Sequence, residues 1–185
     1  MPKMSDIKQR CKGNIKPYLL WLLLTAALVV IDQISKYLTV LYMPKNETIK
    51  VIPYLFNFVY VENRGAAWGM LADQRWIFIV ISSVAIVVIG AVLLYMARAK
   101  KTLVISLVLI LSGGVGNMID RIANGFVVDF IQFGFWQSFP VFNVADSFVT
   151  IGGFMLLIYV IFIDGSLFKN KKKQDEENNN GDTTA

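Results

Sequence analysis

Long apolar runs dominate the chain, and most polar residues lie between the runs or at the chain ends. Each run approaches the roughly 20 residues that a helix needs to cross the hydrocarbon core of a bilayer. The apolar residues fill whole runs rather than amphipathic stripes, so the pattern predicts an integral membrane protein, mainly α, with four transmembrane helices. The predicted spans are about residues 18–41, 76–97, 103–119 and 144–163.

Two longer segments connect the predicted spans at one end. Residues 42–75 contain a β-prone run at 56–61 with Pro and Gly around it, which predicts a small β-rich flap. Residues 120–143 are dense in aromatic side chains, which prefer the headgroup level and predict an interfacial loop. The predicted division is a tail at 1–17, a membrane domain at 18–165 and a disordered tail at 166–185.

The positions of basic residues predict the orientation of the chain. With four spans, all three basic clusters lie on one side, which the positive-inside rule assigns to the cytoplasm. Both termini are then cytoplasmic, and the two longer segments face outward. The formal charge is +5, but because Lys and Arg lie beside apolar runs, we expect membrane lipids rather than nucleic acid as the partner. The basic clusters are at residues 3–16, 98–101 and 169–173.

Composition excludes several kinds of chemistry. The hydrophobic fraction of 56% is too high for an ordinary soluble domain. There is no histidine and only one cysteine, Cys11. A disulfide within the chain and a His-dependent triad are therefore excluded, and a zinc site has too few ligands. We expect no metal and no cofactor.

Ionisable side chains beside apolar spans are costly, and they are candidates for function. Asp32 and Lys36 are four residues apart in the first span, so they share a helix face. They form either a helix-stabilising ion pair or a charge pair that positions a substrate or a loop. Asp120, next to Arg121, has a structural interpretation as a helix-end acid or a partner of a nearby backbone group.

Asp129 and Asp146 favour a catalytic interpretation. The third span ends outward near Asp120 and the fourth begins near Asp146, so chain geometry brings these acids and Asp129 to one end of a helical hairpin. Asn143 is the better placed N-cap of the fourth span, which leaves Asp146 for another role. Two carboxyl groups held close share a proton near neutral pH, and such a pair can hydrolyse an amide without a covalent nucleophile.

Three alternatives stay open at this stage. Ser147 with Lys36 could form a serine–lysine dyad, since Lys can serve as the base where His is absent. A small proton-coupled transporter could use Asp32, Asp129 and Asp146 as a relay, although a relay expects acids spread through the membrane depth. A structural subunit would have no chemistry of its own.

Five blocks of residues together resemble the bacterial lipoprotein signal peptidases, also called signal peptidase II. They occur in one order across residues 18–165, and one departure is Trp68, where that family usually has Phe. The blocks are residues 32–36 (DQISK), 62–69 (ENRGAAWG), 113–121 (GGVGNMIDR), 127–130 (VVDF) and 142–147 (FNVADS).

The resemblance implies an aspartic endopeptidase that removes signal peptides from diacylglyceryl-modified prolipoproteins, cleaving before the lipid-bearing cysteine. It implies a bacterial plasma membrane protein whose site faces outward and which the cyclic peptide globomycin inhibits; we also expect a monomer. Its catalytic pair matches Asp129 and Asp146. The positions that it implies for substrate binding or site shaping are Asn63, Gly65, Asp32, Lys36, Asn117, Asp120, Arg121, Asn143 and Ala145.

Overall fold

A computed structural model describes residues 15–45, 47–65, 70–71 and 74–164, with backbone alone at 163 and 164. The predicted disordered tail lies outside these residues, as do Cys11 and Trp68. In the described part of the chain, four helices are long and apolar enough to cross a membrane. They are α2 (Lys16–Tyr42), α3 (Arg75–Met96), α4 (Lys101–Ala123) and the span Val144–Phe162, which comprises α5 (Val144–Ile158) and most of η2 (Tyr159–Asp164).

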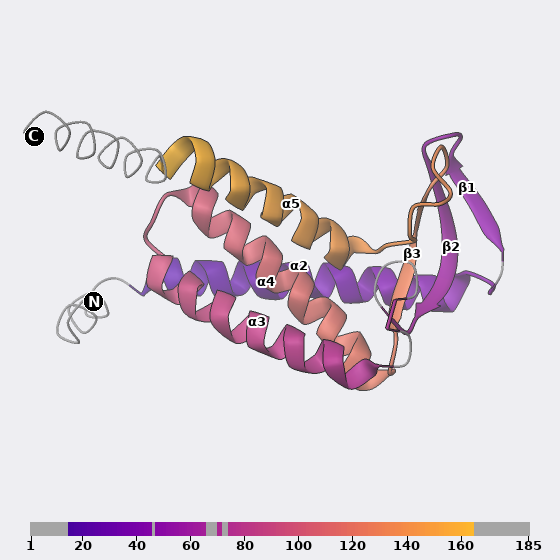
Figure 1. The fold of residues 1–185 in the computed structure, drawn as a ribbon, viewed down its shortest axis with the longest axis horizontal. Coiled ribbons are helices and arrows are strands. Elements are labelled where there is room, and N and C mark those ends of the chain that lie inside the picture. The colour runs from indigo at the N-terminus through magenta and orange to yellow at the C-terminus, as the bar shows by residue number, and fades with distance from the viewer. Residues whose placement is uncertain (1–14, 46, 66–69, 72–73, 165–185) are drawn as a thin grey trace, which may run out of the picture.

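The four helices form a bundle with a small sheet at one end (Figure 1). Helix α4 packs against α2, α3 and α5. In its most apolar stretch 39% of the residues are buried, against 6%, 6% and 11% in the other spans. Helix α4 is therefore the centre of the bundle, and the outer helices present their apolar side chains to lipid. The core beside it contains Leu93, Val104, Leu107 and Val108.

The sheet is antiparallel, with strand order β1-β2-β3. Strands β1 (Thr48–Ile52) and β2 (Phe56–Asn63) form the predicted flap. The four helices and this flap confirm the predicted fold class. Strand β3 (Val127–Phe133) was not predicted, because the aromatic density of the segment indicated an interfacial loop.

Helix α4 extends four residues beyond the predicted span, which ended at residue 119, and Asn117 and Asp120 both lie inside the helix. A span predicted from apolar residues alone is too short here, because polar residues that have partners within the bundle also belong to the helix. The helix ends at Ala123, and Gly125 then has a φ of +85°. This left-handed conformation favours glycine and turns the chain from α4 into β3.

Helices α4 and α5 approach closely at Gly152. A Cβ atom at this position would lie 2.8 Å from the carbonyl oxygen of Ser106 and 2.9 Å from Leu109 Cβ. At the next residue, Gly153, a Cβ atom would meet nothing within 4 Å. The two glycines therefore offer a matched pair in one helix.

We predict that Gly152→Ala lowers the free energy of unfolding by about 1–3 kcal/mol, because overpacking forces the two helix backbones apart. Gly153→Ala is expected to be neutral or slightly stabilising, since alanine favours a helix. Both are measured by unfolding of the purified protein in detergent. Equal effects of the two substitutions would contradict the close α4–α5 contact.

Candidate active site

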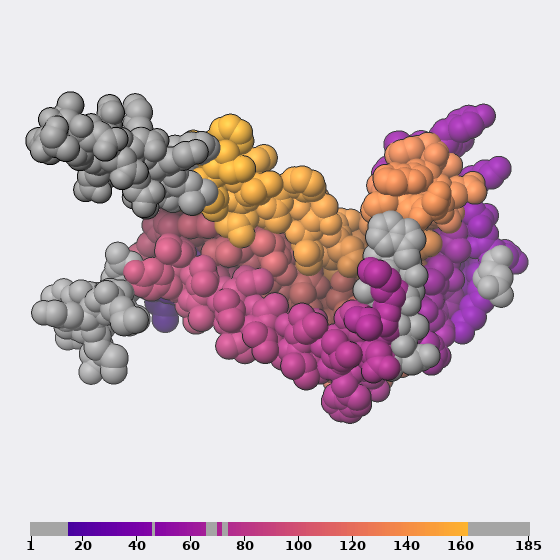
Figure 2. Space-filling model, viewed as in Figure 1, coloured from indigo at the N-terminus to yellow at the C-terminus, as the bar shows by residue number. Residues whose placement is uncertain are grey.

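Asp129 and Asp146 line the same pocket from different elements. Asp129 lies within β3 and is 2% exposed, whereas Asp146 lies in the first turn of α5 and is half-buried. The pocket has a volume of about 870 Å³. In Figure 2 the molecule is hollowed between α5 and the lobe around β3. The pocket wall beyond the two acids is largely apolar and includes Phe56, Phe58, Ile131, Phe133, Phe139 and Ile151.

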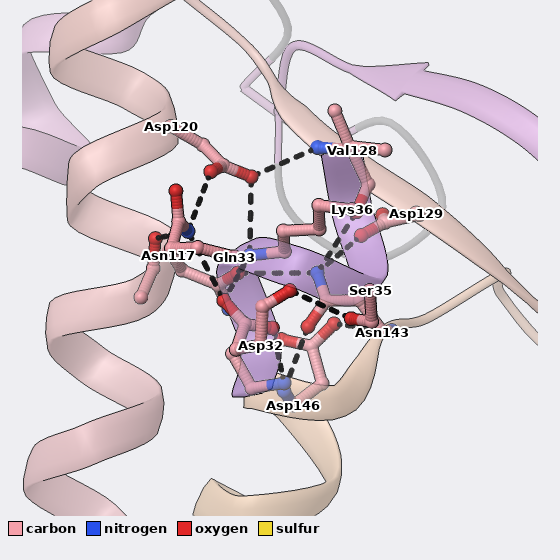
Figure 3. Close-up of polar contacts among 12 residues, drawn as sticks. Asp32, Gln33, Ser35, Lys36, Asn117, Asp120, Val128, Asp129, Asn143 and Asp146 are labelled. Carbon is pink, nitrogen blue, oxygen red and sulfur yellow. Dashed lines mark hydrogen bonds and ion pairs between the residues drawn. The ribbon is translucent and has the colours of Figure 1, made fainter. Parts of the chain in front are cut away.

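Asn143 joins the two aspartates. Its side-chain Nδ2 donates to Asp129 Oδ1 at 2.7 Å, and its backbone N–H donates to Asp146 Oδ2 at 3.1 Å (Figure 3). Asn143 is also the N-cap of α5, and its Oδ1 accepts from the backbone N–H of Asp146. The cap was predicted, but Asp146 is not released from capping, because its own side chain completes the capping box.

Each of the four carboxylate oxygens of the pair accepts a hydrogen bond from an amide group. Asn63 Nδ2 donates to Asp129 Oδ2 at 2.8 Å, and Asn117 Nδ2 donates to Asp146 Oδ1 at 2.7 Å. Asn143 supplies the other two. All these donors are neutral, so they orient the carboxyl groups without the full charge stabilisation that a cation in contact would give.

The register of β2 and β3 brings Asn63 to Asp129. Close to the turn that joins β1 to β2, Phe58 of β2 pairs with Ile131 of β3. If this pairing continued without a shift, Asp129 would pair with Tyr60. A register shift instead pairs Asp129 with Val61. Side chains alternate between the two faces of a strand, so this one-residue shift puts Asn63 on the same face as Asp129. Asn63 in turn accepts a hydrogen bond from the backbone N–H of Gly65 at 3.0 Å.

Burial raises the pKa of Asp129 from 3.8 to about 7. The nearby charge of Asp146 contributes to this rise of the pKa, whereas hydrogen bonds from Asn63 and Asn143 and the charge of Lys36 act in the opposite direction. A carboxyl group with such a pKa holds its proton for part of the time at neutral pH. Burial and the charge of Asp146 thus both favour the protonated form of Asp129.

Lys36 forms a buried ionic cluster beneath the pair. Its Nζ lies 2.8 Å from Asp32 Oδ2, 3.1 Å from Asp120 Oδ2 and 2.9 Å from Asn117 Oδ1 (Figure 3). Lys36, Asp32 and Asp120 are at most 3% exposed. The ammonium group has three donors, and each has an acceptor. The predicted Asp32–Lys36 ion pair forms, and Asp120 has Lys36 rather than Arg121 as its partner.

The cluster reaches the backbone beside both aspartates. Asp32 Oδ1 accepts from the N–H of Ala145 at 2.9 Å, one residue before Asp146. Asp120 Oδ2 accepts from the N–H of Val128 at 3.1 Å, one residue before Asp129. The carboxylates that neutralise Lys36 therefore also hold α5 and β3 in place.

Gln33 belongs to this cluster and was missed in the sequence. Its Nε2 donates to Asp120 Oδ1 at 3.0 Å and to the carbonyl oxygen of Gly116 at 3.1 Å. The sequence feature that could have identified Gln33 is its amide side chain inside an apolar span, next to Asp32. The serine–lysine alternative is wrong, because Lys36 is enclosed by its three acceptors and Ser147 Oγ donates to the carbonyl oxygen of Asn143 at 3.0 Å.

Arg121 and Gly65 line the pocket beside the pair. The guanidinium carbon of Arg121 lies 5.0 Å from the centre of the Phe78 ring, and its Nη2 lies 3.5 Å from the carbonyl oxygen of Gly65. All the sequence-predicted site residues thus meet in one region, in the pocket or in the cluster beneath it. The small pair at residues 66 and 67 lies outside the described residues.

The fold and the site define a multi-pass membrane protein with one buried and one half-buried carboxyl group in a pocket at the sheet end of its helical bundle. Residues 24–162 match the family described as Signal peptidase (SPase) II, and the chain belongs to this family. It is therefore a peptidase of a bacterial membrane, and this identity favours the peptidase interpretation over the transporter.

Named relatives and solved structures agree with this membership. The chain is 46% identical over 149 residues to the lipoprotein signal peptidase of Brevibacillus brevis, covering 79% of this chain and 97% of that protein. It is 42% identical over 135 residues to that of Streptococcus thermophilus, covering 71% and 86%. A solved structure described as a bacterial membrane enzyme at 2.3 Å resolution is similar with a TM-score of 0.68 and 32% identity, covering 80% of this chain and 90% of that chain.

We predict that Lys36→Met lowers the free energy of unfolding by about 3–5 kcal/mol, because it leaves two buried carboxylates without their cation. Lys45→Met is the matched control, since Lys45 forms a 2.6 Å ion pair with Glu62 but is 63% exposed. Exposed pairs contribute little to stability, so the control is expected to unfold like the unmodified protein. Unfolding in detergent measures both, and similar losses would contradict a special role of the buried cluster.

Proposed function

We propose that this protein is a membrane-embedded aspartic endopeptidase that removes signal peptides from diacylglyceryl-modified prolipoproteins, cleaving before the lipidated cysteine. One observation carries the proposal: Asp129 and Asp146 line one largely apolar pocket and share Asn143 as a hydrogen-bond donor. The names of the relatives, lipoprotein signal peptidase, supply the class of substrate.

In the proposed reaction the pair carries a single proton. The ionised carboxylate takes a proton from water, and the water oxygen attacks the carbonyl carbon of the scissile peptide bond. The protonated carboxyl group donates its proton to the carbonyl oxygen. The tetrahedral intermediate then collapses: one of its hydroxyl groups gives a proton to the now ionised carboxylate as the C=O bond re-forms, and the C–N bond breaks. The departing amine takes its proton from the other carboxyl group, so the pair again holds a single proton.

Neighbouring polar groups have supporting roles in this proposal. Asn63 and Asn143 orient Asp129, and Asn117 orients Asp146. Arg121 and Gly65 lie at the pocket wall, where a guanidinium and a backbone carbonyl can bind the substrate peptide. Asp32, Lys36, Asp120 and Ala145 position the two elements that carry the acids.

The apolar wall of the pocket suits a lipidated substrate. Aromatic side chains of β2, β3 and the following segment face the pocket opposite Ile151 of α5. Acyl chains that enter from the bilayer can pack there while the peptide reaches the acids. In this proposal the sheet lies at the outer face of the membrane, both termini are cytoplasmic, the protein acts as a monomer, and globomycin competes for the same pocket.

We predict that Asp129→Asn and Asp146→Asn each lower the rate of cleavage by at least about 10²–10⁴-fold, because each removes one of the two proton-transfer groups. The assay is cleavage of a diacylated prolipoprotein peptide by purified protein in detergent. Glu62→Gln, a carboxylate on β2 outside the pocket, is the control and should retain activity. Near-normal cleavage by either aspartate variant, folded as judged by its unfolding transition, would refute the dyad.

We predict that kcat/KM falls above about pH 7, where Asp129 loses the proton that the carbonyl oxygen needs. Asn63→Ala removes a hydrogen bond that lowers this pKa, so the alkaline limb should move to higher pH by roughly one unit. Asn57→Ala, also on β2 and also buried, is the control and should leave the limb in place. A limb that does not respond to Asn63→Ala would mean that Asp129 does not set it.

A further inference from the structure

A second pocket lies at the end of the bundle away from the sheet. It has a volume of about 390 Å³ and is lined by Tyr18 of α2, by Tyr95 and Met96 at the end of α3, and by Arg98 and Ala99 of the α3–α4 turn. This volume falls near the lower end of the roughly 300–1,000 Å³ that small-molecule pockets span. The candidate active site, at the other end of the span, makes no use of it.

The walls of this pocket are fixed by side-chain contacts between α2 and the turn. Trp21 Nε1 donates to the carbonyl oxygen of Ala97 at 2.9 Å, and Trp21 also packs against the bundle core. The guanidinium carbon of Arg98 lies 5.6 Å from the centre of the Tyr18 ring. These contacts hold Arg98 beside the opening in a defined position.

Positive charge surrounds the pocket. Lys16 lies two residues before Tyr18, and Lys100 and Lys101 follow Ala99 directly. These three lysines and Arg98 are all exposed. Asp164 ends η2 at the same end of the bundle, and its side chain is outside the described residues. The other acidic side chains that the structure describes lie toward the sheet: Asp32, Glu47, Glu62, Asp120, Asp129 and Asp146.

The surroundings of the pocket are those of a membrane interface. Tyr18, Trp21 and Tyr95 form an aromatic group at the end of the apolar helices, which is the level of lipid headgroups. Directly below it, Leu22 and Leu94 are 64% and 62% exposed on α2 and α3. A ligand that fits both features has an anionic head and apolar chains.

We propose that this pocket binds the phosphate of an anionic phospholipid, such as phosphatidylglycerol, in the leaflet opposite the aspartates. Arg98 contacts the phosphodiester, the lysines around it add to the attraction, and the acyl chains lie along the exposed leucines of α2 and α3. Basic pockets between transmembrane helices bind anionic headgroups in this manner. A soluble anion would gain the charge contacts but not the apolar ones.

Native mass spectrometry of the purified full chain in detergent, titrated with phosphatidylglycerol or phosphatidylcholine of the same chains, tests the proposal. We expect the unmodified protein to retain phosphatidylglycerol preferentially. Arg98→Gln should weaken phosphatidylglycerol binding about fivefold, the loss expected for one charge at an anionic surface, while Arg98→Lys loses less. Phosphatidylcholine binding should not change.

Lys50→Gln is the matched control, because it removes one exposed cation from β1 at the sheet end. If it weakens phosphatidylglycerol binding as much as Arg98→Gln does, the attraction is diffuse and the pocket assignment is overturned. Inorganic phosphate at equal concentration should not displace the lipid. Displacement by phosphate would assign the pocket to a soluble anion instead, and would also overturn the proposal.

Cleavage of the diacylated peptide provides an independent check on folding. In detergent without added lipid, Arg98→Gln is expected to cleave at the rate of the unmodified protein, because Arg98 lies at the far end of the bundle. The lipid site can therefore fail while the peptidase proposal stands, or the reverse, and the two results are distinguishable.

Discussion

A lysine side chain buried in the bundle, Lys36, imposes the constraint on which the rest of the site depends. A buried ammonium group is costly unless every N–H has an acceptor, and Lys36 finds its acceptors in Asp32, Asp120 and Asn117. These groups come from α2 and α4, so the charge fixes one helix against the other. Both carboxylates also accept hydrogen bonds from backbone N–H groups of the elements that carry Asp129 and Asp146.

This arrangement keeps the ammonium group of Lys36 out of direct contact with Asp129 and Asp146. Asp32 and Asp120 contact Lys36, whereas all hydrogen-bond donors to Asp129 and Asp146 among the described residues are amide groups. A cation in direct contact would favour the ionised form of both acids. Burial of Asp129 can raise its pKa to about 7 because the compensating charge lies elsewhere. The carboxylates of Asp32 and Asp120, which bind Lys36, are thus separated from the carboxyl groups of Asp129 and Asp146, which line the pocket.

Much of this organisation could be predicted from the sequence, for local reasons. Acidic residues inside or beside apolar runs can be recognised as functional candidates, because burying their charge is costly. A helix N-cap such as Asn143 can be recognised from its position just before a predicted span. Strand β3 could not be predicted, because its pairing with β2 depends on residues more than 60 positions apart in the chain. Gln33 was missed for a related reason: besides its neighbour Asp32, its acceptors are Gly116 and Asp120 on α4, which the local sequence does not indicate.

The register shift in β2 shows how a non-local feature determines the chemistry. Without the extra residue between Phe58 and Val61, Asn63 would point to the face of the sheet opposite Asp129. Asp129 would then lose one of its two amide donors, while the ionic cluster beneath it would be unchanged. The cluster therefore sets where the two acids lie, and the sheet sets how one of them is hydrogen-bonded. A relative that keeps the helices but lacks this bulge would keep the bundle and change the hydrogen bonding, and with it the pKa, of Asp129.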